Sequence, residues 1–366
     1  MAPCDVRAGR LPNRQRTAHH GGGQVTAQSR GSKRRILVGA AAGAAIIGVG
    51  AVVRSRRTRS SATFVAEPNP ALSDPVHRPE TISVTSADGH PIHVVAYGDP
   101  EAQPIVLSHG WTCSTAYWYP QINALADDFR VITYDQRGHG RTELGRNPLS
   151  TDLLADDLAA VLEATVTGDK KAVVVGHSMG GMSIMSWAGK YPEHVRAKAR
   201  AVMLASTATD SLVAESTLIP LSQRLPTIPP PVGRVLLGWR SSVRVDMPAT
   251  RRVIQYAAMA PGSTREEVAF CTRIVLDCHG RTRGGWGAAL SMLDIRAALE
   301  NLQVPTTVLV GTADRLTPQS HSRRISDVLD EAGHLQRLIR LPAIGHMSTV
   351  EAPGPVNDEI RRLARL

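Results

Sequence analysis

The sequence predicts an α/β fold, with a mainly parallel sheet covered by helices on both faces. From residue 81 onward, short runs of strand length alternate with segments of helical periodicity. Several of the runs are apolar throughout, as is typical of strands that are buried on both faces. Strands that alternate with helices in this way form sheets with helices on both sides. In such sheets the functional residues lie at the carboxyl ends of the strands.

The elements follow in order along the chain. Strands are expected at 81–85, 92–97, 105–108, 131–134, 172–176, 201–205, 304–311 and 335–341. Helices are expected at 118–126, after a cap at Thr151, at 179–190, after a cap at Thr317 with proline as the first helical residue, and at 356–365.

Residues 207–300 interrupt this alternation. They contain several prolines and helical stretches, one of which begins with the capping box Thr264-Arg-Glu-Glu267. The segment is too long for a loop. We therefore expect a helical cap at 207–300, inserted into a core made of 80–206 and 301–366. The seven-residue spacing of Cys271 and Cys278 puts their Cα atoms about 10.5 Å apart in one continuous helix, beyond the reach of a disulfide.

The charge of the chain is concentrated at its N-terminus. Residues 1–60 carry 12 Lys/Arg and one acidic residue, whereas the rest carries 30 Lys/Arg and 31 Asp/Glu, for a net charge of +10 overall. The globular part is thus close to neutral, which argues against a nucleic-acid partner. Four cysteines in 366 residues exclude a scaffold built on disulfides.

The first 79 residues divide into three segments: a disordered basic tail at 1–35, an apolar run at 36–53 and a linker at 54–79. The apolar run holds 18 residues without a polar side chain. As a helix it would be about 27 Å long, near the minimum for crossing a bilayer. We expect a single-pass membrane anchor, hence a membrane-anchored protein. A signal peptide, a buried helix and a nucleic-acid arm are the alternatives, and the flanking charges barely favour either orientation.

A candidate nucleophile lies at the end of the strand 172–176. The sequence Gly176-His177-Ser178-Met179-Gly180-Gly181 joins this strand to an apolar helix. Small residues two positions either side of Ser178 allow a sharp turn, which places the hydroxyl at a helix N-terminus. An ordinary glycine-rich turn is the structural alternative.

A serine hydroxyl needs a base, and the base needs an orienting carboxylate. His346 follows the last strand and is the preferred base over His321 and His334. Asp314 follows the strand 304–311 and is the preferred acid, with Asp210, after the strand 201–205, as its rival.

The oxyanion of an acyl-transfer intermediate needs two hydrogen-bond donors. The backbone N–H of Met179, next after the serine, is one candidate. The N–H of Trp111, in the loop His109-Gly110-Trp111, is the other. The Trp111 side chain either lines the pocket or packs within the loop.

The order of these motifs, with Asp135-Gln-Arg-Gly-His-Gly140 between the first loop and the serine, resembles the α/β-hydrolase superfamily over residues 80–366. It is most similar to the serine-nucleophile branch of esterases, lipases, cofactor-free haloperoxidases and prolyl aminopeptidases. The resemblance implies a triad of Ser178, Asp314 and His346. It also implies that the loop from Asp135 to Gly140 is structural, with His139 near the pocket.

Together these features predict a serine hydrolase that cleaves carboxylic esters of short-to-medium acyl chains through an acyl-enzyme. No cofactor or metal is expected, because no His/Cys cluster has ligand spacing and no Gly-rich loop follows the first strand. Perhydrolysis, amide or C–C bond hydrolysis and acyl transfer are alternatives on the same triad, and a non-catalytic receptor is a further one. Apolar cap residues that could cover an acyl chain are Leu218, Ile219, Leu221, Val235, Leu236, Leu237 and Trp239.

Overall fold

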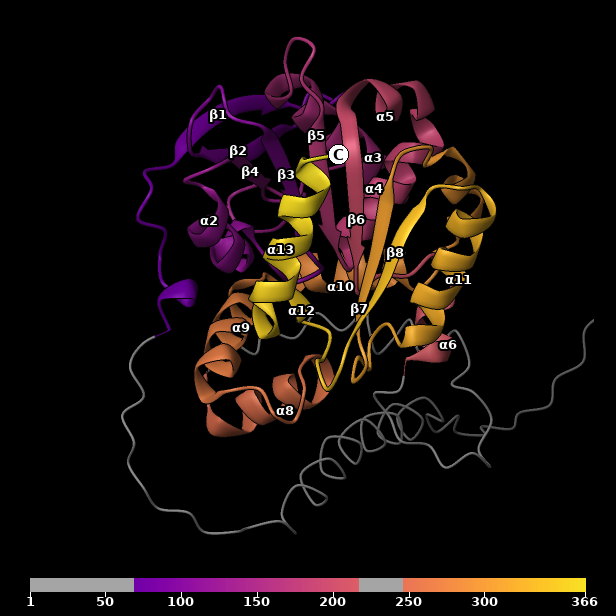
Figure 1. Ribbon diagram of the computed structural model, residues 1–366. Helices are drawn as coiled ribbons and strands as arrows, with labels where there is room; N and C mark the ends of the chain where they lie inside the picture. The colour runs from indigo at the N-terminus through magenta and orange to yellow at the C-terminus, as the bar shows by residue number, and fades with distance from the viewer. Residues whose placement is uncertain (1–68, 217–245) are drawn as a thin grey trace, which may run out of the picture. The chain divides into compact units, whose positions relative to one another are not determined.

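The computed structural model describes residues 69–216 and 246–366 (Figure 1). These residues form an eight-stranded sheet in the order β1-β2-β4-β3-β5-β6-β7-β8. β2 pairs antiparallel with β1 and β4 at one edge, and the remaining neighbours are parallel. The strands are β1 Glu80–Thr85, β2 Pro91–Tyr97, β3 Pro104–Ser108, β4 Arg130–Tyr134, β5 Ala172–His177, β6 Ala199–Ala205, β7 Thr306–Gly311 and β8 Leu335–Leu341.

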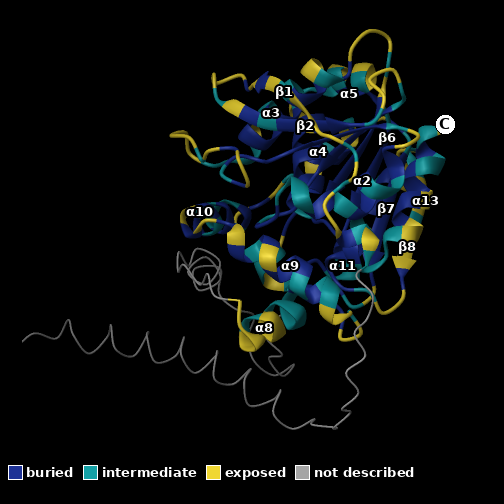
Figure 2. Cartoon of the chain, turned by 90° about the vertical axis from the view of Figure 1, so that its left-hand side faces the viewer, coloured by how far each residue is buried: buried dark blue, intermediate teal, exposed yellow. Residues whose placement is uncertain are grey.

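The central strands supply side chains to two hydrophobic cores, one on each face of the sheet. In β5, Val174 packs into one core and its neighbours Val173 and Val175 into the other. The first core includes residues of α3 (Thr151–Thr165), α4 (Met179–Lys190) and α11 (Gln319–Glu331). The second includes residues of α2 (Tyr119–Leu125) and α13 (Pro353–Ala364). Burial on both faces explains the apolar runs, and the predicted parallel sheet with helices on both sides is confirmed (Figure 2).

Some helix ends differ from the predicted ones. Ser150 caps α3, because its hydroxyl accepts a hydrogen bond from the Leu153 N–H over 3.3 Å, so the cap at Thr151 is wrong. α11 begins at Gln319, with Pro318 at the N-cap in place of Thr317. The short helices α5 (Pro192–Lys198) and α12 (Ser348–Glu351) were not expected. At α3 the adjacent residues Ser150 and Thr151 have similar capping ability, and only the backbone conformation of the folded chain decides which of them caps the helix.

The described parts of the insertion between β6 and β7 are helical. They comprise α6 (Leu212–Glu215), α8 (Pro248–Ala258), α9 (Arg265–Asp277), α10 (Gly280–Leu290) and the 3-10 helix η3 (Arg296–Asn301). Both hydrogen bonds of the predicted capping box form between Thr264 and Glu267. α9 ends before Cys278, so the two cysteines do not share one continuous helix, but both are buried and free. The apolar cap residues from Leu218 to Trp239 lie outside the described residues.

Residues 1–68 also lie outside the described part, including the expected tail, the apolar segment 36–53 and most of the expected linker. Within 69–216 and 246–366, no helix has the length and apolar character needed to cross a bilayer. At the end of the expected linker the chain contacts the folded core at Leu72 and Ser73, whereas Val76 is 97% exposed. The 3-10 helix η1 (Pro70–Leu72) buries Leu72, and the Asn123 amide donates to the Ser73 carbonyl over 3.0 Å.

Candidate active site

Ser178 lies on a strained turn between β5 and α4. Its φ is 52° and its ψ is −115°, a conformation that residues other than glycine rarely adopt. The turn is held by a 2.9 Å hydrogen bond from the Ser178 N–H to the Ala205 carbonyl of β6. A Cβ at position 180 would lie 1.9 Å from the Ser108 carbonyl oxygen, and one at 176 would lie 2.4 Å from the Gly180 carbonyl oxygen. Glycine at both positions therefore permits the turn, and the turn presents Ser178 at the start of α4.

His346 follows β8 and is held at three points. Its Nδ1 lies 2.9 Å from Oδ2 of Asp314, and both side chains are buried. Its backbone N–H donates to the Ala258 carbonyl over 2.9 Å, and its carbonyl accepts from Nε2 of His177 over 2.8 Å. Because His177 directly precedes Ser178, this last bond places His346 beside the serine turn. No hydrogen bond joins the Ser178 hydroxyl to the imidazole within the described residues.

Asp314 is kept ionised by its surroundings. Its Oδ1 accepts the backbone N–H groups of Leu316 and Thr317, each over 2.9 Å, and its Oδ2 accepts the Thr317 hydroxyl over 2.8 Å. Burial opposes the charged form, but the charge and hydrogen bond of His346 and the Thr317 donors outweigh it and lower the pKa of Asp314. An ionised Asp314 holds the proton of His346 on Nδ1 and leaves Nε2 free to accept one.

The loop after β3 lies against the serine turn. A Cβ at Gly110 would lie 2.8 Å from Nδ1 of His177 and 3.1 Å from Cβ of Ser178, so glycine allows this approach without displacing the His177 ring. The backbone N–H groups of Trp111 and Met179 have no hydrogen-bond partner among the described residues. They are the two donors that the sequence indicates for an oxyanion. The side chain of Trp111 is half-buried, and its Nε1 donates to the Arg283 carbonyl of α10 over 3.1 Å.

Two buried histidines brace this loop. Nε2 of His139 accepts the Thr112 N–H over 3.1 Å, and Nε2 of His109 accepts the Gln136 N–H over 3.0 Å. Burial lowers the pKa of His139 to about 4, so the ring is neutral at pH 7 and carries its proton on Nδ1. His139 thus supports the loop through the residue after Trp111.

The rival residues have other partners. The carboxylate of Asp210 pairs with Arg324 and Arg296 instead of with His346. His321 lies buried in α11. The carbonyl of His334, just before β8, accepts the Thr306 N–H of β7. Of the candidates for acid and base, the structure brings only Asp314 and His346 into direct contact.

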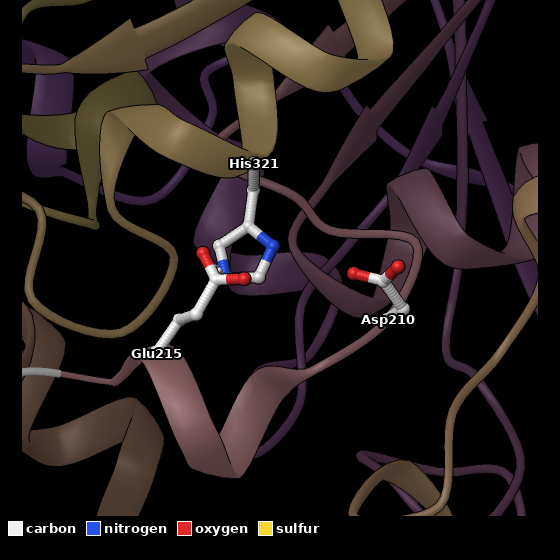
Figure 3. A group of neighbouring side chains, drawn as sticks. All are labelled: Asp210, Glu215 and His321. Atoms are coloured by element: carbon white, nitrogen blue, oxygen red, sulfur yellow. Dashed lines mark ion pairs between the residues drawn. The ribbon is translucent and has the colours of Figure 1, made fainter.

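Asp210, Glu215 and His321 form the only group in the described residues with metal-ligand geometry, their ligand atoms lying within 4.8 Å of one another. Figure 3 shows His321 between the two carboxylates. Arg324 contacts all three side chains, at distances between 2.9 and 3.1 Å. Because a guanidinium only donates, Nδ1 of His321 must accept, which places the ring proton on Nε2, the atom 3.6 Å from Glu215. That proton and the charge of Arg324 oppose a metal ion, so the group is an ion-pair network.

The sequence did not indicate the supporting roles of Thr317 and His177. Thr317 was expected to cap a helix, but its hydroxyl lies 2.8 Å from Asp314 and 3.2 Å from Nδ1 of His346. A threonine three residues after an aspartate is a local signal for such a hydrogen bond. The contact of His177 with His346 spans 169 positions, and no local pattern announces it.

Comparison with known proteins agrees with this geometry. Residues 103–226 match a family described as alpha/beta hydrolase fold. The chain is 31% identical to a bifunctional esterase/perhydrolase of Acinetobacter calcoaceticus, over 74% of this chain and 94% of that protein. It is 28% identical to a non-heme chloroperoxidase of Burkholderia pyrrocinia, over 74% of this chain and 94% of that one.

Among solved structures, the esterase RhEst1 of Rhodococcus sp. superposes with a TM-score of 0.62 at 24% identity, covering 78% of this chain and 98% of that one. This likeness shows a shared fold. The relative of 31% identity shows more than a shared fold, because that identity extends over 94% of its own length and 74% of this chain. The chain is an enzyme that belongs to the α/β-hydrolase superfamily.

Proposed function

We propose that the protein is a serine hydrolase that cleaves carboxylic esters through an acyl-enzyme. The observation that carries this proposal is the placement of Ser178 on a positive-φ turn beside a buried His346–Asp314 pair 2.9 Å apart. The esterase named among the relatives supports the ester as substrate.

In this mechanism Nε2 of His346 takes the proton of the Ser178 hydroxyl as the oxygen attacks the ester carbonyl. The oxyanion accepts hydrogen bonds from the N–H groups of Trp111 and Met179, and the imidazolium returns its proton to the leaving alcohol. Water then attacks the acyl-enzyme with His346 again as the base, which releases the acid and restores the serine. Asp314 orients the ring throughout.

We further propose a preference for short-to-medium acyl chains. The apolar cap residues that support it lie in the sequence 218–239, outside the described residues. Each methylene buried is worth about 0.8 kcal/mol, or roughly fourfold in specificity. A series of p-nitrophenyl esters from acetate to palmitate tests this, with kcat/KM expected to peak below the longest chains. Preference for emulsified long-chain triglyceride would contradict it.

Labelling with a fluorophosphonate tests the serine itself. Folded wild-type protein should form an adduct at Ser178, and Ser178→Ala should form none. Absence of an adduct in active wild-type protein would refute the assignment, whereas absence of both adduct and turnover would favour a receptor on the same fold.

Perhydrolysis is the second candidate, because one relative is named an esterase/perhydrolase and another a chloroperoxidase. The acyl-enzyme is the same, but hydrogen peroxide replaces water as the attacking nucleophile and the product is a peracid. Peracid formation from an ester and peroxide, measured beside hydrolysis in the same sample, separates the two.

For the location we propose that residues 36–53 anchor the protein in a membrane, on the basis of their unbroken apolar sequence and flanking arginines. A truncated protein of residues 64–366 keeps the compact unit that includes Asn69 and Leu72. It should no longer bind the membrane and should still hydrolyse esters. Uncleaved full-length protein in the soluble fraction would contradict the anchor.

A further inference from the structure

Glu351, the last residue of α12, binds two separate segments with a single oxygen. Its Oε2 accepts the Gly345 N–H over 3.1 Å, one residue before His346. The same oxygen accepts the Ala260 N–H over 2.7 Å and the Ser263 hydroxyl over 2.8 Å, both in the insertion. The side chain therefore bridges the turn that carries His346 and the connection between α8 and α9.

The two bridged segments are also in direct contact. The carbonyl of Ala258, at the end of α8, accepts the backbone N–H groups of His346 over 2.9 Å and of Met347 over 3.1 Å. A Cβ at Gly345 would lie 2.5 Å from the Ala260 nitrogen, which leaves room only for glycine. Displacement of the α8–α9 connection would thus move the backbone of His346.

We propose that Glu351 is a positioning residue that clamps the His346 turn to the insertion, so that the placement of the insertion sets the placement of the base. This inference rests on the proposed role of His346. A shift of about 1 Å at a reacting group can cost roughly 100-fold in rate, so the clamp acts on kcat more than on KM.

The contacts of Glu351 indicate that the length of its side chain is more important for bridging the two segments than its charge. All three donors bind Oε2, and Oε1 is buried without a hydrogen-bond partner among the described residues. Burial raises the pKa of Glu351, while the three donors oppose that shift only in part. A neutral amide oxygen at the same distance can accept the same bonds, whereas a shorter carboxylate cannot reach both segments.

Two substitutions separate reach from charge. Glu351→Gln keeps the reach and removes the charge, and its kcat should stay within about threefold of wild type. Glu351→Asp keeps the charge and loses one methylene, and its kcat should fall about 30- to 100-fold with KM changed less than about threefold. Glu300→Asp is the matched control, since it removes the same methylene from an exposed glutamate of the insertion. Its kcat should be unchanged.

The pattern of results decides the proposal. An active Glu351→Asp with an inactive Glu351→Gln would show that charge matters, and the clamp would be wrong. Equal kcat in all variants would refute it as well. A fluorophosphonate that labels Ser178 counts the folded active sites in each variant. If Glu351 had a merely structural role, its substitution would lower that count without changing the kcat of each labelled site.

Failure of the proposed function gives a different result. If the wild type neither turns over esters nor reacts with the probe, the catalytic assignment fails. The clamp then still predicts faster hydrogen exchange at the amides of Gly345 and His346 in Glu351→Asp than in Glu351→Gln. Unchanged exchange there would overturn it.

Discussion

Arg324 binds the carboxylate of Asp210, with Nη2 3.1 Å from Oδ1. Asp314 instead accepts the Nδ1 proton of His346 over 2.9 Å. Both aspartates follow neighbouring parallel strands, β6 and β7, so their positions along the chain are comparable. Their partners distinguish them: one carboxylate belongs to an ion-pair network, and the other contacts the imidazole.

The two aspartates should therefore respond differently to the same substitution. Asp314→Asn should lower kcat by up to about 10⁴-fold, because an amide can hold the imidazole in the wrong tautomer. Asp210→Asn should lower kcat by less than about tenfold, since it loses only ion pairs. Ester turnover measures both, and circular dichroism checks folding. A crippled Asp210→Asn beside a nearly wild-type Asp314→Asn would reverse the assignment.

Ser178 and His346 should act as a unit. Ser178→Ala and His346→Ala should each lower kcat by about 10⁴- to 10⁶-fold, because one removes the nucleophile and the other its base. The double variant should be little worse than either single one. The mechanism would be wrong if the losses in kcat of the two single variants added up in the double variant. It would also be wrong if purified Ser178→Ala kept more than about 1% of wild-type turnover.

Removal of a buried charge partner should destabilise the fold. The side chain of Arg137 is 1% exposed and that of Asp157 is 3% exposed, and they lie 2.6 Å apart. Asp157→Asn removes one carboxylate partner of the buried Arg137 guanidinium. It should lower the free energy of unfolding by about 3–5 kcal/mol, measured in urea. Glu101→Gln, which breaks the exposed pair with Lys170, should cost less than about 1 kcal/mol. Equal costs would contradict this.

Stability should also fall in acid through Glu359. Its Oε1 accepts the Thr307 hydroxyl over 2.6 Å and Nη2 of Arg362 over 2.7 Å. Burial opposes the charge, but Arg362 and Thr307 outweigh it and lower the pKa of Glu359. The unfolded chain therefore binds the proton more readily, so this stabilisation is full above the unfolded pKa of about 4.3 and is lost as pH falls through the folded value.

Glu359→Gln tests that sign. The variant should be less stable than wild type at pH 7 and should lose less stability between pH 5 and 3.5, measured as urea midpoints. A loss in acid as steep as that of the wild type would show that other groups carry the dependence.

Apart from the short helices α5 and α12 and some helix ends, the sequence by itself determined the strands, the helices that cover the sheet and the serine turn. Each is a local matter: buried strands need apolar residues throughout, and the turn at Ser178 needs glycine at 176 and 180 because a Cβ there would meet backbone within 2.4 Å. Such steric and solvation requirements act within a few residues, so they leave a local pattern. The order of these patterns resembles the α/β-hydrolase superfamily, and the comparison with known proteins shows that the chain belongs to it.

Only the tertiary structure decided which distant side chains meet. Asp210 and Asp314 follow adjacent strands, yet only Asp314 reaches His346, 32 positions away. Glu351 binds Ala260 across 91 positions, and Arg324 binds Asp210 across 114. Hydrogen bonds depend on distances of about 3 Å and on direction. Those quantities arise only when the sheet brings strand ends together, which is why no spacing in the chain encodes them.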